Sequence, residues 1–231
     1  MTRILSIETA TSICSVAIHE DEQCSHISEI SEPQAHSAKL TVLIEEMLAH
    51  ASLSIQDFNA IAISEGPGSY TGLRIGTSVA KGLCYAADLP LITINTLESL
   101  TLQYIPKLQE SLPDKAILCP MIDARRMEVY TAQFNAGMTQ LQKTQPLVVT
   151  EETIHLFDAQ NSYYLFGDGS QKLQDILSAA HIHFVPNITC SSESVGRIAY
   201  SQYNQGNFAD VAYFEPFYLK NFQATTPKKQ L

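Results

Sequence analysis

The alternation of apolar and polar stretches along the chain predicts a pair of strands followed by a helix. Residues 4–7 and 13–18 are apolar and rich in β-branched side chains, and the polar residues 8–12 separate them, which is typical of a β-hairpin. From Leu40 onward, apolar side chains recur three and four positions apart, as they do along one face of a helix. We expect this helix to end near His50.

A glycine-rich turn separates the next two predicted elements. Residues 58–64 form an apolar run that predicts a buried strand, and the Gly-Pro-Gly-Ser sequence at 66–69 ends it. A second helix is expected from there to Tyr85. Small residues recur along this helix, at Gly72, Gly76, Ala80 and Gly82. Each interior glycine costs about 1 kcal/mol relative to alanine, so we expect another backbone to approach this helix closely.

A change in composition divides the chain into two lobes. Pro106 and Pro113 flank a polar stretch, and we place the boundary there, with an N-terminal lobe at 1–105 and a C-terminal lobe at 106–231. The last helix and the tail could return to the first lobe. The second lobe is predicted to contain strands at 116–122, 127–134 and 163–166 and helices at 170–180 and 194–203.

Charge and composition narrow the classes of function. The chain has 231 residues, a formal net charge of −10 and no cluster of Lys or Arg apart from Lys228-Lys229, so it is poorly suited to gripping nucleic-acid phosphates by itself. Its five cysteines are scattered without a Cys-x-x-Cys pair, which is typical of reduced thiols in the cytoplasm. No apolar run approaches the ~18 residues of a membrane span. We therefore expect a cytoplasmic protein without membrane attachment.

The most specific sequence in the chain is the glycine-rich stretch at 64–83. Its pattern predicts a strand, a turn and a helix N-terminus, where free N–H groups and the helix dipole favour an anion. It lacks the Gly-Lys-Ser/Thr sequence of a Walker A loop. Judged from the residues alone, such a turn is more often a structural corner than a phosphate site.

This stretch resembles the signature of the TsaB (YeaZ) family, with Gly-Pro-Gly-Ser-Tyr-Thr-Gly-Leu-Arg at 66–74 matching throughout. Residues 7–11 are similar to the family's opening hairpin, 122–130 to the start of its second lobe and 215–220 to its C-terminal signature. The resemblance covers nearly the whole chain and is weakest at 135–163. It implies an α/β, two-lobed actin-like and ribonuclease H-like ATPase fold of the superfamily of sugar kinases, Hsp70 and actin (ASKHA), with a mixed sheet flanked by helices in each lobe.

The resemblance also implies a chain without an active site of its own. Active members of the superfamily clamp ATP between the lobes and carry an Asp and a Gly in the first hairpin, where this chain has Glu8 and Ala10. The catalytic paralogue TsaD has a His-x-x-x-His metal site in a stretch similar to 95–100. Here Thr96 and Leu100 stand in place of the two imidazoles, and neither supplies a nitrogen ligand. We expect no catalytic residue, no intrinsic cofactor and no metal, and the binding of ATP or ADP at a contact with a partner stays open.

The function implied is that of a non-catalytic scaffold or activating subunit in forming threonylcarbamoyladenosine (t6A) at adenosine 37 of tRNAs that read codons beginning with A. Its partners would be a TsaD-like catalytic paralogue and a TsaE-like ATPase, tRNA would be contacted only indirectly, and the chain alone would form a homodimer. The alternative is an independent enzyme, either nucleotide-dependent and kinase-like or metallopeptidase-like. The partner surface is expected on the two helices of the first lobe, at Leu40, Leu43, Ile44, Met47, Gly72, Gly76 and Leu83.

Overall fold

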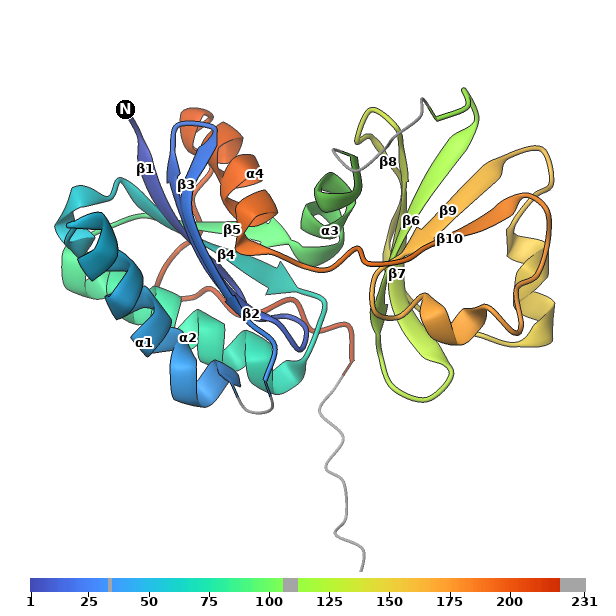
Figure 1. Cartoon of the computed structure of the whole chain (residues 1–231), viewed down its shortest axis with the longest axis horizontal. Coiled ribbons are helices and arrows are strands. Elements are labelled where there is room, and N and C mark those ends of the chain that lie inside the picture. Colours follow the sequence, from blue (N-terminus) through green and yellow to red (C-terminus); the bar gives the residue numbers. More distant parts are fainter. Residues whose placement is uncertain (33–34, 106–111, 221–231) are drawn as a thin grey trace, which may run out of the picture.

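The structure, a computed structural model, describes residues 1–32, 35–105 and 112–220 and consists of two lobes, each built on a five-stranded sheet (Figure 1). The first sheet has the order β3-β2-β1-β4-β5, in which β1, β2 and β3 are antiparallel neighbours and β4 and β5 run parallel to β1. Its strands are β1 (Arg3–Glu8), β2 (Cys14–Glu20), β3 (Gln23–Ile30), β4 (Ala60–Gly66) and β5 (Leu91–Asn95).

The second sheet repeats the connectivity of the first. Its order is β10-β9-β6-β7-β8, with β6, β7 and β8 antiparallel and with β9 and β10 parallel to β6. This repetition confirms the predicted α/β, two-lobed actin-like and ribonuclease H-like fold with a mixed sheet in each lobe. The strands are β6 (Ala116–Asp123), β7 (Glu128–Asn135), β8 (Gln140–Val148), β9 (Ser162–Phe166) and β10 (Ile182–Val185).

Helices cover both faces of the first sheet. Side chains alternate between the two faces of a strand, so Leu5 and Ile7 of β1 face α1 (Ala35–Ala51) and α2 (Tyr70–Ala87). Ile4 points to the opposite face, where α4 (Ser192–Asn204) covers it with Val195. The last helix of the chain therefore lies on the sheet formed by the first residues. No helix in the described ranges is long and apolar enough to cross a membrane.

The helix α3 (Thr96–Tyr104) lies between the lobes (Figure 1). Leu97, Leu100 and Tyr104 pack in one apolar cluster with Leu118 and Phe166 of the second sheet. The sequence analysis assigned these residues to the first lobe, at 1–105. In the structure, their side chains are buried against the second sheet. The expected boundary at 105/106 adjoins residues 106–111, which lie outside the described part of the chain.

The helix expected at 170–180 is replaced by a 3-10 turn, η4 (Gln171–Leu173). The N–H groups of Ile176 and Leu177 both donate to the carbonyl of Leu173, so the hydrogen bonds do not advance by one residue at a time as they do in a helix. Leu173 and Leu177 are nevertheless buried, as the apolar spacing predicted. Two further short turns are η1 (Ile55–Asp57) and η3 (Glu151–Leu156).

The glycines of α2 allow the turn between β1 and β2 to lie directly against the helix. A Cβ atom added at Gly72 would lie 2.1 Å from the carbonyl oxygen of Thr9, and one at Gly76 would lie 2.2 Å from Thr9 Oγ1. Gly82, by contrast, faces open space, with no atom within 4 Å of an added Cβ. The close approach that the glycines predicted therefore occurs inside the lobe, at Thr9.

We predict opposite effects on stability when two glycines of α2 are replaced by alanine. Gly76→Ala should lower the free energy of unfolding by about 1–3 kcal/mol, because the new methyl group collides with Thr9. Gly82→Ala should raise it by up to about 1 kcal/mol, because alanine favours the helix and meets no neighbour. Urea unfolding at equal protein concentrations measures both changes. Equal stabilities of the two variants would contradict the packing described for Gly76.

Candidate functional site

The turn that would face a phosphate in the first lobe is filled by the chain's own backbone. The N–H of Ser69 donates to the carbonyl oxygen of Ala10 over 2.6 Å, and a Cβ at Gly68 would lie 2.4 Å from that same oxygen. The Ser69 side chain caps α2 by accepting a hydrogen bond from the N–H of Gly72. The N–H groups of Ser69 and Gly72 at the start of this helix are thus already engaged, and Gly68 occupies the space beside Ala10.

Glu8, at the end of β1, is turned into the protein. Its Oε1 accepts a hydrogen bond of 2.5 Å from the N–H of Ala10, and the side chain is fully buried. Burial raises the pKa of Glu8 to about 7, although the N–H of Ala10 acts in the opposite direction. The side chain of Ser64 also acts to lower the pKa of Glu8. The buried hydroxyls of Thr9 and Thr77 have no hydrogen-bond partner among the described residues.

The corresponding turn of the second lobe, between β6 and β7, is held by Lys172. Its ammonium group donates to Asp123 Oδ1 at 2.5 Å and to the carbonyl oxygens of Arg126 and Glu128 at 2.8 and 2.6 Å. These contacts use all three donors of a lysine. The N–H of Asp123 donates in turn to Asp168 Oδ1 over 3.0 Å, so the turn is linked to the loop after β9. Like the first turn, this one is filled by groups of the chain itself.

The two positions that correspond to metal ligands in the paralogue are both buried. Thr96 Oγ1 accepts a hydrogen bond from the N–H of Gly66 over 3.1 Å, and this bond joins α3 to the end of β4. Leu100 is only 1% exposed and belongs to the apolar cluster of the second lobe. Among the residues that the structure describes, no three His, Cys, Asp or Glu side chains gather as a metal site would require. These residues do not fit the metal site of the paralogue.

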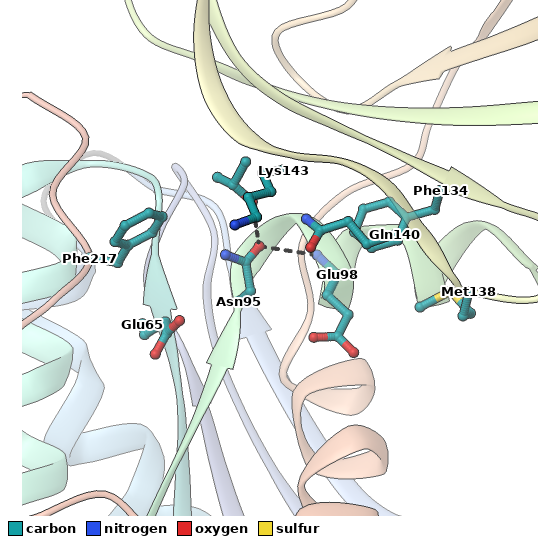
Figure 2. A pocket seen from close by; sticks show the side chains of 9 residues that line it. Glu65, Asn95, Glu98, Phe134, Met138, Gln140, Lys143 and Phe217 are labelled. Atoms are coloured by element: carbon teal, nitrogen blue, oxygen red, sulfur yellow. Dashed lines mark hydrogen bonds between the residues drawn. The ribbon is translucent and has the colours of Figure 1, made fainter.

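A cleft of about 400 Å³ lies between the lobes (Figure 2). Burial raises the pKa of Glu98, and the negative charge of Glu65 raises it further. The cleft therefore holds two carboxyl groups together with the ammonium group of Lys143 from β8. The cleft is lined by Glu65, Asn95, Glu98, Phe134, Met138, Gln140, Lys143, Thr144 and Phe217.

Asn95 connects the two walls of this cleft. Its Oδ1 accepts hydrogen bonds from the N–H groups of Leu97 and Glu98 at 3.0 and 3.4 Å, which caps the N-terminus of α3 (Figure 2). The hydroxyl of Thr144, on β8 of the second lobe, donates to the same oxygen over 3.5 Å. The helix N-terminus at the cleft is therefore already capped.

The residues expected to form the partner surface lie mostly inside the first lobe. Leu40, Leu43, Ile44 and Met47 are at most 6% exposed and pack on the first sheet, Gly72 and Gly76 are buried against Thr9, and Leu83 is half-buried. The apolar spacing marked the inner face of each helix, because that is the face that the sheet covers. The expectation that these side chains form an exposed surface is thus corrected.

The outer face of the same helices carries residues that the periodicity did not single out. Tyr85 of α2 is 88% exposed and Val42 of α1 is 39% exposed. Ser78 and Gly82, which precede Tyr85 by about two turns and one turn of α2, are exposed as well. A large aromatic side chain outside the apolar stripe of a helix is the sequence signal that could have found Tyr85.

We predict that Glu8→Gln stabilises the protein only at neutral and higher pH. Because burial raises the pKa of Glu8 from 4.5 to about 7, the folded state binds the extra proton between these values, and the free energy of unfolding falls by roughly 3 kcal/mol as the pH rises through them. Glutamine keeps the acceptor for Ala10 but cannot ionise. Urea unfolding at pH 5 and pH 8 should therefore show a much larger gain at pH 8.

Comparing the parent and the variant at the same pH controls for His19, another buried titratable group of this lobe. Burial lowers the pKa of His19 to about 4, so His19 destabilises the folded state as the pH falls from 6.5 to that value, in the parent and the variant alike. An equal gain for Glu8→Gln at both pH values would contradict the ionisation of Glu8 described above.

The chain matches known proteins over most of its length. The family model described as TsaD, tRNA N6-adenosine threonylcarbamoyltransferase, matches residues 29–222. Among solved structures, YeaZ from Pseudomonas aeruginosa has a TM-score of 0.78 and 21% sequence identity, with 95% of this chain and 100% of that chain covered. That similarity shows the shared fold.

Two relatives of this chain are both described as tRNA threonylcarbamoyladenosine biosynthesis protein TsaB. The tRNA threonylcarbamoyladenosine biosynthesis protein TsaB of Escherichia coli K12 is 30% identical over 226 residues, which cover 95% of both chains. TsaB of Haemophilus influenzae is 35% identical over 130 residues, or 56% of this chain and 52% of that protein. With the family model matching most of its length, this chain belongs to the TsaB (YeaZ) family of t6A biosynthesis proteins, within the wider TsaD family.

Proposed function

We propose that this chain is the non-catalytic subunit of a complex that transfers threonylcarbamoyl to adenosine 37 of tRNA, together with a TsaD-like catalytic paralogue and a TsaE-like ATPase. The observation that carries the proposal is the closure of both hairpin turns by the chain's own groups, Ser69 on Ala10 in the first lobe and Lys172 on Asp123 in the second. A nucleotide clamped between the lobes would need these turns for its phosphates.

The burial of Thr96 and Leu100 supports the same proposal, since a catalytic metal would need two nitrogen ligands at those positions. It also weighs against the alternative of an independent kinase-like or metallopeptidase-like enzyme. The formal charge of −10 makes tRNA a poor direct ligand, so the proposal assigns tRNA binding mainly to the partner. Binding of ATP or ADP at the contact between the two subunits stays a prediction.

The outer faces of α1 and α2 are the surface that we propose for the partner and for a second copy of the chain. The two helices lie side by side on one face of the first sheet and leave their other sides open (Figure 1). Gly82 gives a second helix room to approach, and Tyr85 beside it supplies a large apolar area to bury. The proposed surface therefore lies on the same two helices that the sequence predicted. It is formed by residues on their outer faces, whereas the predicted residues lie on their inner faces.

Reconstitution tests the function directly. The chain, the paralogue and the ATPase are incubated with unmodified tRNA, threonine, bicarbonate and ATP, with the enzyme that makes the activated threonylcarbamoyl donor supplied in every reaction. Omitting this chain should abolish t6A formation, and the chain alone should hydrolyse no ATP. Nucleoside mass spectrometry and a phosphate-release assay give the two readouts. Undiminished t6A in the reaction that lacks the chain would overturn the proposed role.

We predict that an added charge on the outer face of α1 or α2 separates the subunits. Val42→Asp and Tyr85→Asp should each weaken homodimers and the complex with the paralogue at least tenfold, because a carboxylate without a partner would be buried at the contact, at a cost of several kcal/mol by order of magnitude. The matched control is Val148→Asp, which changes an exposed valine of the second lobe. Light scattering after size exclusion and co-purification measure assembly. Loss of assembly in the control alone would place the interface elsewhere.

A further inference from the structure

The segment after α4 is attached to the first lobe along α2. The N–H of Ala209 donates to the carbonyl oxygen of Leu91 at the start of β5. Further along, the ammonium group of Lys81 on α2 donates to the carbonyl oxygens of Ala212 and Phe214 at 3.0 and 3.1 Å. These bonds hold the chain in position as it approaches the gap between the lobes.

Phe217 continues this path past the end of β4. Its N–H donates to the carbonyl oxygen of Glu65 over 2.7 Å. Gly66 has a φ of +118°, and a Cβ there would lie 2.8 Å from the carbonyl oxygen of Phe217, so a glycine is needed for the segment to pass. Tyr218 then packs its ring against that of Tyr70 at the start of α2, with 5.0 Å between the ring centroids.

Lys220 completes the crossing to the second lobe. Its ammonium group forms an ion pair with Glu128 at the start of β7 and lies 5.7 Å from the centroid of the Tyr130 ring. Phe217 lines the interlobe cleft beside Glu65 (Figure 2), and a second, small cavity is enclosed between Pro67 and Tyr130 by the same segment. Within four residues, the chain therefore contacts both lobes.

We propose that residues 215–220 are a latch that holds the two lobes together without a ligand. In a two-lobed protein that clamps a nucleotide, the ligand joins the lobes, whereas here the chain supplies the connection itself through Phe217 on one side and Lys220 on the other. Because the Lys220–Glu128 pair is partly open to solvent, it is weak and screened by salt, so the latch is reversible. Its release lets the lobes open on this side of the gap, while the apolar contacts of α3 still join them and each lobe keeps its own fold.

Buried cysteines provide a built-in measure of such opening. Cys190 lies where the lobes meet, because it is buried in the apolar cluster that α3 forms with Leu118 and Phe166 of the second sheet. Burial raises the pKa of its thiol, and the charges of Glu8 in the first lobe and Asp168 in the second raise it further. Cys84 is buried within the core of the first lobe and Cys119 within that of the second. Opening of the latch should expose Cys190 and leave the other two thiols protected.

The test compares alkylation rates of the three thiols, by peptide mass spectrometry, in the purified full-length chain and its variants. Lys220→Gln and Glu128→Gln should each accelerate labelling of Cys190 by roughly two- to fivefold, as expected for loss of a partly exposed ion pair. The double variant should be labelled no faster than either single variant, because both changes remove the same contact.

A chain ending at Phe214 should show a larger increase in the labelling rate of Cys190. High salt should accelerate labelling of Cys190 in the parent protein. Arg3→Gln, which breaks the Arg3–Glu20 pair inside the first lobe, is the matched control and should leave Cys190 unchanged.

Two results would overturn the latch. An unchanged rate at Cys190 in both the Lys220→Gln variant and the shortened chain would show that the segment does not hold the lobes. Equal acceleration at Cys84, Cys119 and Cys190 would show that it stabilises the protein as a whole and has no specific effect on the gap. Neither result bears on the t6A assay, since that assay measures the complex and this one the isolated chain.

Discussion

The close approach of the β1–β2 turn to α2 is the contact on which the arrangement of the first lobe depends. Thr9 and Ala10 lie directly against Gly68, Gly72 and Gly76, at distances that a side chain on any of the three glycines would block. This contact fixes how closely α2 packs on the turn and engages the N–H of Ser69 at the start of the helix. It also turns the opposite side of the helix, with Tyr85, toward solvent.

In both lobes the turn of the first hairpin is filled by groups of the chain itself, although the residues involved differ. In the first, backbone from the glycine-rich turn fills the hairpin, while in the second a lysine ammonium group satisfies three oxygens of the hairpin at once. Each arrangement pairs polar groups that a phosphate or metal would otherwise have to satisfy.

The interlobe contacts come from three parts of the chain that are distant in sequence. The helix α3 contributes its apolar face to the second lobe, Asn95 at its start bonds to Thr144, and the segment with Phe217 and Lys220 crosses at the other side. The cleft between them is bordered by the carboxyl groups of Glu65 and Glu98 and by the ammonium group of Lys143. The relative position of the lobes is therefore a property of the chain's own side chains.

The spacing of apolar residues predicted β1, β2, β4, β6, β7 and β9 and the helices α1, α2 and α4, because such spacing follows from which side chains a sheet or helix must bury. The fold class came from the resemblance of the glycine-rich stretch to a known family, and the mostly polar strands β3 and β8 and the helix α3 were not predicted. The sequence also determined that Thr96 and Leu100 cannot ligate a metal as histidines do. Only the tertiary structure decided which way each helix face points: the apolar side chains from Leu40 to Met47, and the glycines at 72 and 76, meet the lobe's own sheet and turn. Periodicity identifies a face to be buried but not its partner, since one's own sheet and another subunit bury apolar surface equally well. Likewise, the contacts of Lys172 with Asp123 and of Lys220 with Glu128 join residues 49 and 92 positions apart, a pairing that only the folded chain brings about.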